Sequence, residues 1–139
     1  FNPNGARKAQ VNWLRKKIDS GACFVYTQPV FDEETLGWVC ETAAEFPEIR
    51  FFAGILPLSS ARQARSLADG RIPGVHVPER IVAALMRFSD VSDQKRKAGE
   101  IALELSLKAA RSVRGVYLIP PFSSDGMEIV SQILELIRE

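Results

Sequence analysis

An uncharged amide side chain is the group in this sequence best placed to contact a ligand. Gln28 ends a short apolar run, Cys23 to Thr27, and a proline follows it directly. An amide both donates and accepts hydrogen bonds without carrying charge, which suits the polar edge of a heterocycle better than it suits an anion. A glutamine at this position can also form hydrogen bonds that only hold a loop together, so the residue type alone does not decide between a ligand contact and a loop role.

Three further residues have the chemistry to contact a ligand. Gln63 lies in the first turn of the helix that follows Gly54-Ile-Leu-Pro57, and a solvent-exposed helical residue is the alternative interpretation. Lys16 and Lys17 lie near the end of the first helix, where surface cations interact favourably with the helix dipole even without a ligand.

The common catalytic motifs are missing from the sequence. It has no glycine-rich phosphate loop, no Cys-x-x-Cys, no His-Glu-x-x-His and no Gly-x-Ser-x-Gly. His76 is the single histidine, and we interpret it as a loop residue. The carboxylates fall mostly on predicted helix faces, where solvated charge is the usual role. We therefore predict no catalytic residue and no metal ligand in this chain.

Composition narrows the class of protein. The 139 residues suffice for one core, and with 46% hydrophobic and 25% charged residues they match a soluble globular domain. A net charge of +1 gives no reason to expect nucleic acid or a membrane surface. No apolar run approaches the ~20 residues that span a bilayer, and no signal peptide opens the sequence. We expect a cytoplasmic protein with reduced cysteines. Because the sequence opens at Phe1, we also expect a piece of a longer protein.

Helical and strand patterns alternate along the chain and would position these residues. Helix signals cover residues 6–19, 33–46, 59–68, 78–88 and 90–112, with a final helix from Ser124 or Asp125 onward. Strand signals cover residues 23–27, 49–56 and 115–119. Expected N-caps are Asp32 and Ser59 or Ser60.

This alternation predicts an α/β fold with parallel strands and right-handed crossovers. Each strand runs into a polar or proline-bearing segment at its carboxyl end, which is where TIM barrels build their sites. An open doubly wound sheet also fits, but this detail favours the last three β/α units of a (β/α)8 TIM barrel. Residues 1–139 would then form the C-terminal portion of that barrel.

Several motifs, taken in order along the chain, resemble methylenetetrahydrofolate reductases. They are Leu14-x-x-Lys17-x-x-x-Gly21-Ala22-x-Phe24-x-x-Thr27-Gln28-Pro29-Val30-Phe31-Asp32, Gly54-Ile-Leu-Pro-Leu-Ser59 with Gln63-Ala64 and Leu67, Arg71-Ile-Pro73, and Gly115-Val-Tyr-Leu118. Each motif is modest, whereas the ordered set is specific and covers essentially the whole chain. Gln28-Pro29-Val30-Phe31-Asp32 and Pro120-Pro121-Phe122 look most like the bacterial branch in which a homocysteine S-methyltransferase domain can precede the reductase.

The resemblance implies a TIM barrel with FAD at its carboxyl-terminal face. NAD(P)H would reduce the flavin, which would reduce 5,10-methylenetetrahydrofolate to 5-methyltetrahydrofolate in one-carbon metabolism and methionine biosynthesis. By position, Gln28 matches a glutamine that contacts the folate and, in turn, the nicotinamide. Gln63 matches a second folate contact, and Lys16 and Lys17 match a basic pair on the FAD phosphates. The resemblance also implies a homo-oligomeric parent protein.

The chain departs from the family pattern in ways that matter for activity. Leu67 stands where some members carry an aromatic folate contact, and Phe122 where some carry an arginine. The family's general-acid glutamate and most FAD contacts would come from earlier strands, so we expect the 139 residues alone to be inactive.

Two other hypotheses stay open. The chain could come from a homologue that has lost flavin and serves as a partner subunit or binding module, or it could be an autonomous α/β domain with an interaction role. Three strands would leave two sheet edges and an apolar face unpaired, so we expect the isolated piece to self-associate or to be poorly stable.

Overall fold

The computed structural model describes residues 1–121 and 126–138, which form six helices and three strands. In chain order these elements are α1 (Arg7–Asp19), β1 (Phe24–Val30), α2 (Glu33–Glu45), β2 (Arg50–Ile55), α3 (Ala61–Ala68), α4 (Glu79–Met86), α5 (Val91–Ser112), β3 (Gly115–Leu118) and α6 (Gly126–Arg138). The predicted alternation of helices and strands is confirmed. Phe122 and the expected start of the last helix at Ser124 or Asp125 lie outside the described residues.

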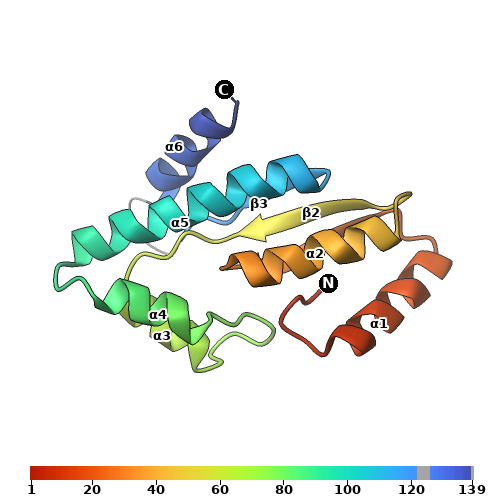
Figure 1. Ribbon diagram of the computed structural model, residues 1–139, viewed down its shortest axis with the longest axis horizontal. Coiled ribbons are helices and arrows are strands. Elements are labelled where there is room, and N and C mark those ends of the chain that lie inside the picture. Colours follow the sequence, from red (N-terminus) through yellow and green to blue (C-terminus); the bar gives the residue numbers. More distant parts are fainter. Residues whose placement is uncertain (122–125, 139) are drawn as a thin grey trace.

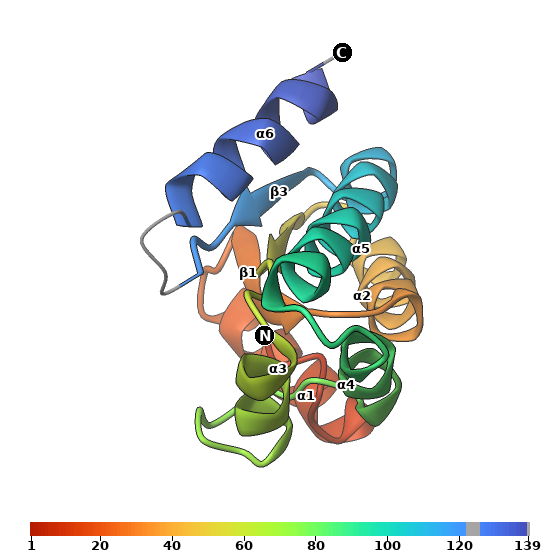
Figure 2. The same cartoon turned by 90° about the vertical axis from the view of Figure 1, so that its left-hand side faces the viewer.

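The three strands form one parallel sheet in the order β1-β2-β3. The connections between strands pass through helices, as a parallel sheet requires. Helices α2 and α5 lie on one face of the sheet, and the opposite face carries no helix of the described chain (Figures 1 and 2). This is the α/β arrangement of three consecutive units of a (β/α)8 barrel, whose strands bear helices only on the outside.

Alternating side chains make the two faces of the sheet different. On the covered face, Val25, Phe51 and Ile55 pack with residues of α2 and α5 into a core of buried aliphatic and aromatic side chains. On the open face, Phe24 and Tyr26 are 54% and 52% exposed. The open face corresponds to the interior of a closed barrel.

A second core lies beyond the carboxyl ends of β1 and β2. It joins the segments that follow these strands to α3, α4 and the loop between them, and its buried members are Phe31, Leu56, Leu58, Ala61, Ala64, Leu67, Val75, Val77, Val82, Leu85 and Ala98. This core fixes the loops at the end of the sheet where a barrel carries its site.

Side-chain caps set where the helices begin. The carboxylate of Asp32 accepts a hydrogen bond from the Thr35 N–H at 2.8 Å, and the Ser60 hydroxyl accepts one from the Gln63 N–H at 3.1 Å. Both caps satisfy backbone donors that a helix leaves free at its start. The prediction of Asp32 is confirmed, and of the two serines it is Ser60 that caps α3.

The predicted end of β1 is wrong. The strand continues past Thr27 through Gln28 and Pro29 to Val30. Proline was expected to stop the strand because it lacks an N–H for the ladder. Here the register between β1 and β2 shifts just before Pro29, and an irregularity of this kind is one of the few places in a sheet that tolerate proline.

The first residue of the chain extends the sheet beyond β1. The Phe1 amino group donates to the Tyr26 carbonyl at 3.0 Å, and the Gln28 N–H donates to the Phe1 carbonyl at 2.7 Å. In a parallel ladder, one residue forms hydrogen bonds with the two residues that flank its partner on the neighbouring strand. Phe1 therefore occupies the position of a further strand beside β1.

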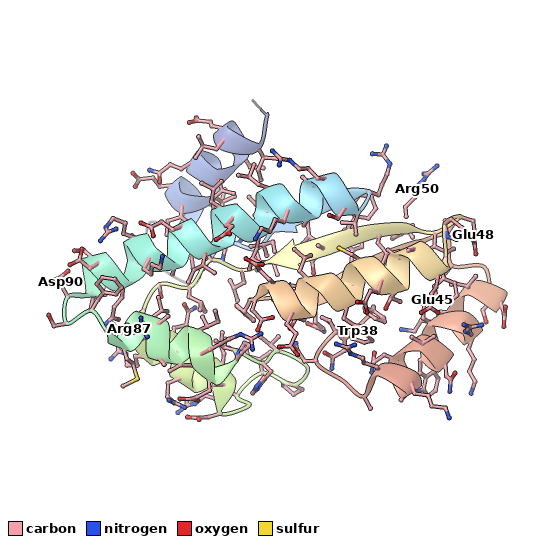
Figure 3. The ribbon with its side chains drawn as sticks, in the orientation of Figure 1. Trp38, Glu45, Glu48, Arg50, Arg87 and Asp90 are labelled. Atoms are coloured by element: carbon pink, nitrogen blue, oxygen red, sulfur yellow. The ribbon has the colours of Figure 1, made fainter. Side chains whose placement is uncertain are left out.

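Charged residues mark the two ends of the sheet. Glu45, Glu48 and Arg50 lie together at the amino-terminal end of the strands, whereas Arg87 and Asp90 lie at the other end of the molecule (Figure 3).

Among the described helices, none is both long and apolar enough to cross a membrane.

Candidate functional site

Gln28 lies on the open face of the sheet, near the carboxyl end of β1. Its side chain is exposed, and its backbone N–H is held by the Phe1 carbonyl. The loop between α3 and α4 passes beside it, since a Cβ at Gly74 would lie 3.7 Å from both Cγ and Cδ of Gln28. Gly74 has a φ of +81°, a conformation that favours glycine. The Gln28 carboxamide is thus exposed to solvent beside the backbone of the loop between α3 and α4, which forms a wall at Gly74.

A network of amides connects the N-terminal segment to this wall. The Asn2 N–H donates to Gln10 Oε1 at 3.1 Å, and the Asn4 side chain donates to the Gly74 carbonyl at 3.3 Å. The Asn2 side-chain nitrogen also approaches Gly74, at 3.5 Å from a Cβ built there. Sequence reasoning did not single out Asn2 or Asn4. Their signal was the Asn-Pro-Asn-Gly turn composition before the first helix.

Gln63 lies at the same end of the sheet, in the first turn of α3, with its carbonyl oxygen already engaged. Oε1 accepts from the Ser59 N–H at 2.7 Å and from the Ser59 hydroxyl at 3.0 Å. This contact, together with the Ser60 cap, closely resembles a capping box, in which a glutamine at the third helical position reaches back over the helix start. The Nε2 hydrogens of Gln63 take no part in these bonds.

Leu67 lies in the second core rather than on an open surface. Its side chain is 5% exposed. Any contact with a ligand would be limited to that small remainder.

Lys16 and Lys17 are exposed and lie at the opposite end of β1 from the two glutamines. They belong to the last turn of α1, which leads into the amino-terminal end of the strand. The Lys16 ammonium lies 5.0 Å from the centre of the Trp13 ring. Lys17 helps line a groove of about 200 Å³ between α1 and β1, together with Phe1, Gln10, Trp13, Leu14, Ala22, Phe24, Val25 and Tyr26. The structure therefore brings Gln28 and Gln63 to one end and leaves the lysines at the other, with this groove beside β1.

Tyr117 is a further residue near Gln28, and sequence reasoning gave it no role. Its hydroxyl donates to the carbonyl of Thr27, the residue before Gln28. Burial, and to a smaller extent Tyr26, raises the pKa of Tyr117 above its ordinary value, so the hydroxyl keeps its proton at neutral pH. The one signal in the sequence that could have pointed to Tyr117 was its place in the motif Gly115-Val-Tyr-Leu118, two residues after the start of the strand.

A second polar cluster lies outside the sheet, near the start of α2. The Arg80 guanidinium contacts Asp32 at 2.5 Å and Glu34 at 3.0 Å. His76 is an exposed loop residue, as predicted, and it lines the same recess. In the described part of the chain, no group of three or more His, Cys, Asp or Glu side chains could hold a metal ion. This cluster is therefore a set of ion pairs that tie α4 to α2.

Parallel strands with outer helices define part of a barrel-type α/β protein, and the exposed Gln28 and the half-buried Gln63 lie at the carboxyl ends of its strands. The sequence model of the family described as methylenetetrahydrofolate reductase matches residues 3–120. The chain belongs to this family. The predicted bifunctional branch stays a prediction.

A curated relative supports the same assignment. The chain is 24% identical over 137 residues to methylenetetrahydrofolate reductase 1 of Schizosaccharomyces pombe. The match covers 97% of this chain and 22% of that protein, so the chain spans about a fifth of the length of its relative.

Proposed function

We propose that residues 1–139 are the C-terminal portion of the TIM barrel of a flavin-dependent methylenetetrahydrofolate reductase. Family membership supports the reaction, and the exposed Gln28 carboxamide at the carboxyl end of β1 is the observation that carries the proposal. In this proposal the complete protein reduces 5,10-methylenetetrahydrofolate to 5-methyltetrahydrofolate with NAD(P)H, as a cytoplasmic homo-oligomer. The isolated piece is inactive.

Gln28 is proposed to bind the polar edge of the folate and, in its turn, the nicotinamide. One uncharged amide can serve two different heterocycles because it offers both a donor and an acceptor. The α3–α4 loop at Gly74, and the hydrogen bond that the Gln28 backbone N–H donates to the Phe1 carbonyl, restrict where the side-chain amide can lie, which is the positioning that such contacts require. When bound, the flavin supplies the hydride chemistry that links the two substrates.

Gln63 is proposed as a second folate contact, with a narrower role than the sequence suggested. Because Ser59 uses its Oε1, only the Nε2 hydrogens remain to donate to a ligand. Leu67 would contribute at most the edge of its side chain, since it is 5% exposed.

Lys16 and Lys17 are proposed to neutralise the FAD phosphates. Their chemistry fits, because exposed ammonium groups bind pyrophosphate, and neither forms a salt bridge with another described residue. Their location demands an extended cofactor. The seven residues of β1 span about 20 Å at ~3.3 Å per residue. A dinucleotide lying along the groove between α1 and β1 would meet this requirement.

The alternative is a homologue that has lost flavin and acts as a partner subunit or binding module. The separation of the lysines from the two glutamines is the observation that favours it. The two functions differ in one property of the complete protein, which is whether it retains FAD.

The test uses the complete protein that contains this chain. Its absorbance spectrum reports bound flavin, and anaerobic mixing follows bleaching by NAD(P)H and reoxidation by methylenetetrahydrofolate separately. We expect both half-reactions, and we expect Gln28→Ala to slow reoxidation with flavin retained. Wild-type rates in Gln28→Ala and Gln63→Ala would refute the assigned roles, and a protein purified without flavin would favour the alternative.

Lys17→Ala should loosen FAD without changing the fold. The matched control is Lys8→Ala, an exposed lysine near the start of the same helix. Flavin retained per protein after gel filtration is the measurement. Equal retention in both variants would remove the lysine assignment.

A further inference from the structure

The ladder between β1 and β2 is interrupted directly beside Gln28. Tyr26 pairs with Phe52 and Pro29 pairs with Gly54. Between these two pairs β1 has two residues, Thr27 and Gln28, where β2 has only Ala53. This is a β-bulge, which inserts one residue, bends the strand and re-aims a side chain.

Two hydroxyl groups satisfy the backbone groups that the bulge leaves without ladder partners. In a regular parallel ladder a backbone carbonyl of β1 would accept from the Gly54 N–H. Here the Thr27 hydroxyl accepts it instead, at 3.0 Å, in a buried position. The Thr27 carbonyl accepts a bond from the Tyr117 hydroxyl, which reaches it from β3 across the width of β2.

Gly54 makes room for Tyr117 to reach that carbonyl. A Cβ at Gly54 would lie 2.6 Å from the tyrosine hydroxyl oxygen and 2.7 Å from Cζ. The ring therefore lies directly over the backbone of β2, where only glycine fits. On its other side the Tyr117 ring packs edge-on against Tyr26, with 5.1 Å between ring centres. These contacts hold the hydroxyl in place.

We propose that Tyr117 is a positioning residue for Gln28. By holding the Thr27 carbonyl, it fixes the bend of β1 that presents the Gln28 carboxamide at the carboxyl end of the sheet. This inference rests on the proposed function of Gln28, and it assigns Tyr117 no contact with folate or nicotinamide. It also gives a reason for the glycine that opens Gly54-Ile-Leu-Pro57: a side chain there would displace the tyrosine.

The test compares variants of the complete, flavin-loaded protein in the two half-reactions. Tyr117→Phe keeps the ring and removes the hydroxyl, which leaves the Thr27 carbonyl without this donor. We expect the rate of flavin reoxidation at saturating methylenetetrahydrofolate to fall about tenfold, the order of effect that losing one hydrogen bond to a half-buried acceptor produces. Flavin content should not change.

The control is Ser106→Ala, which removes a buried hydroxyl that donates to a backbone carbonyl, that of Ala102. Ser106 lies in α5, away from the proposed site, and we expect wild-type rates. Thr27→Val is a second variant, since it removes the other hydroxyl of the bulge. It should slow reoxidation as Tyr117→Phe does, and it keeps the proposal testable if Tyr117→Phe fails to fold.

A double variant separates positioning from general support of the fold. If Tyr117 acts through Gln28, then Tyr117→Phe should slow the reaction in the wild-type background and have no further effect in Gln28→Ala. Equal slowing in both backgrounds, or no slowing in either, would overturn the positioning role and leave Gln28 in place. Wild-type rates in Gln28→Ala alone would instead refute the proposed function, and the positioning role with it.

Discussion

The two faces of the sheet carry different kinds of side chain: one face packs a core, and the other carries the residues proposed to position ligands. Under α2 and α5, alternate residues of β2 are apolar and buried, as Phe51 and Ile55 are at 1% exposure. The open face carries exposed aromatic rings, the glycine beneath Tyr117, and Gln28. A covered face of this kind needs only the right volume and polarity. On the open face, hydroxyl groups, a glycine and a bulge fix the positions of individual backbone and side-chain groups.

The largest contrast between the faces should appear in truncations of phenylalanine. Phe51→Ala should lower the free energy of unfolding of the 139-residue chain by about 3–5 kcal/mol, because it empties a buried site. Phe24→Ala is the matched control on the open face, at 54% exposure, and should cost less than about 1 kcal/mol. Denaturant titrations measure both. The chain is kept dilute and monomeric, because self-association would cover the open face, and equal losses in the monomer would contradict the predicted contrast.

Glycine-to-alanine substitutions sharpen the comparison. Gly54→Ala should destabilise by about 1–3 kcal/mol, because the new methyl overlaps the Tyr117 ring. Gly99→Ala, within α5, meets nothing within 4 Å and should stabilise by about 0.5–1 kcal/mol through helix propensity. Thermal unfolding of the two variants gives the signs. A neutral Gly54→Ala would mean that the ring moves aside freely.

A third prediction concerns the cap that fixes Gln63. Ser60→Ala should cost about 1 kcal/mol, the usual loss for an N-cap serine. If the capping contacts act as a unit, the double variant with Gln63→Ala should cost less than the sum of the two single variants. Full additivity in denaturant titrations would mean that the Gln63 side chain is free of Ser59 and available to a ligand with both its oxygen and its nitrogen.

The smallest effect belongs to a surface pair. Hydrogen bonds from Arg65 lower the pKa of the exposed Glu79 carboxyl below its ordinary value of 4.5. The Arg65–Glu79 pair therefore stabilises the folded state when the pH is above the ordinary pKa of the carboxyl, and this contribution is lost as the pH falls through the lowered pKa. In pH titrations of unfolding, Glu79→Gln should remove a small part of the acid destabilisation. An unchanged pH profile would mean that solvent screens the pair fully.

The sequence predicted the fold well because local signals agree with it. Caps at Asp32 and Ser60, the apolar spacing of the helices and the turns at Gly21 and Gly70 all point to the elements found. The bulge was not predictable, since one inserted residue leaves no trace in the apolar pattern. Pro29 was misinterpreted for this reason.

The candidate site was predictable only in part. Gln28 follows the predicted strand directly, which placed it at the carboxyl end of the sheet, and its side chain is exposed there. The capping role of Gln63 could have been recognised from the Ser60-x-x-Gln63 spacing. The partnership of Tyr117 with Thr27 joins residues 90 apart in sequence, so it required the structure.

The central claim is that the folate meets this chain at the carboxyl ends of its strands, and hydrogen exchange in the complete protein tests it most directly. Methylenetetrahydrofolate should slow amide exchange in residues 27–31 and 71–77. Residues 20–24 and 47–51, at the opposite end of the sheet, should be unaffected. Slower exchange confined to that opposite end would contradict the claim.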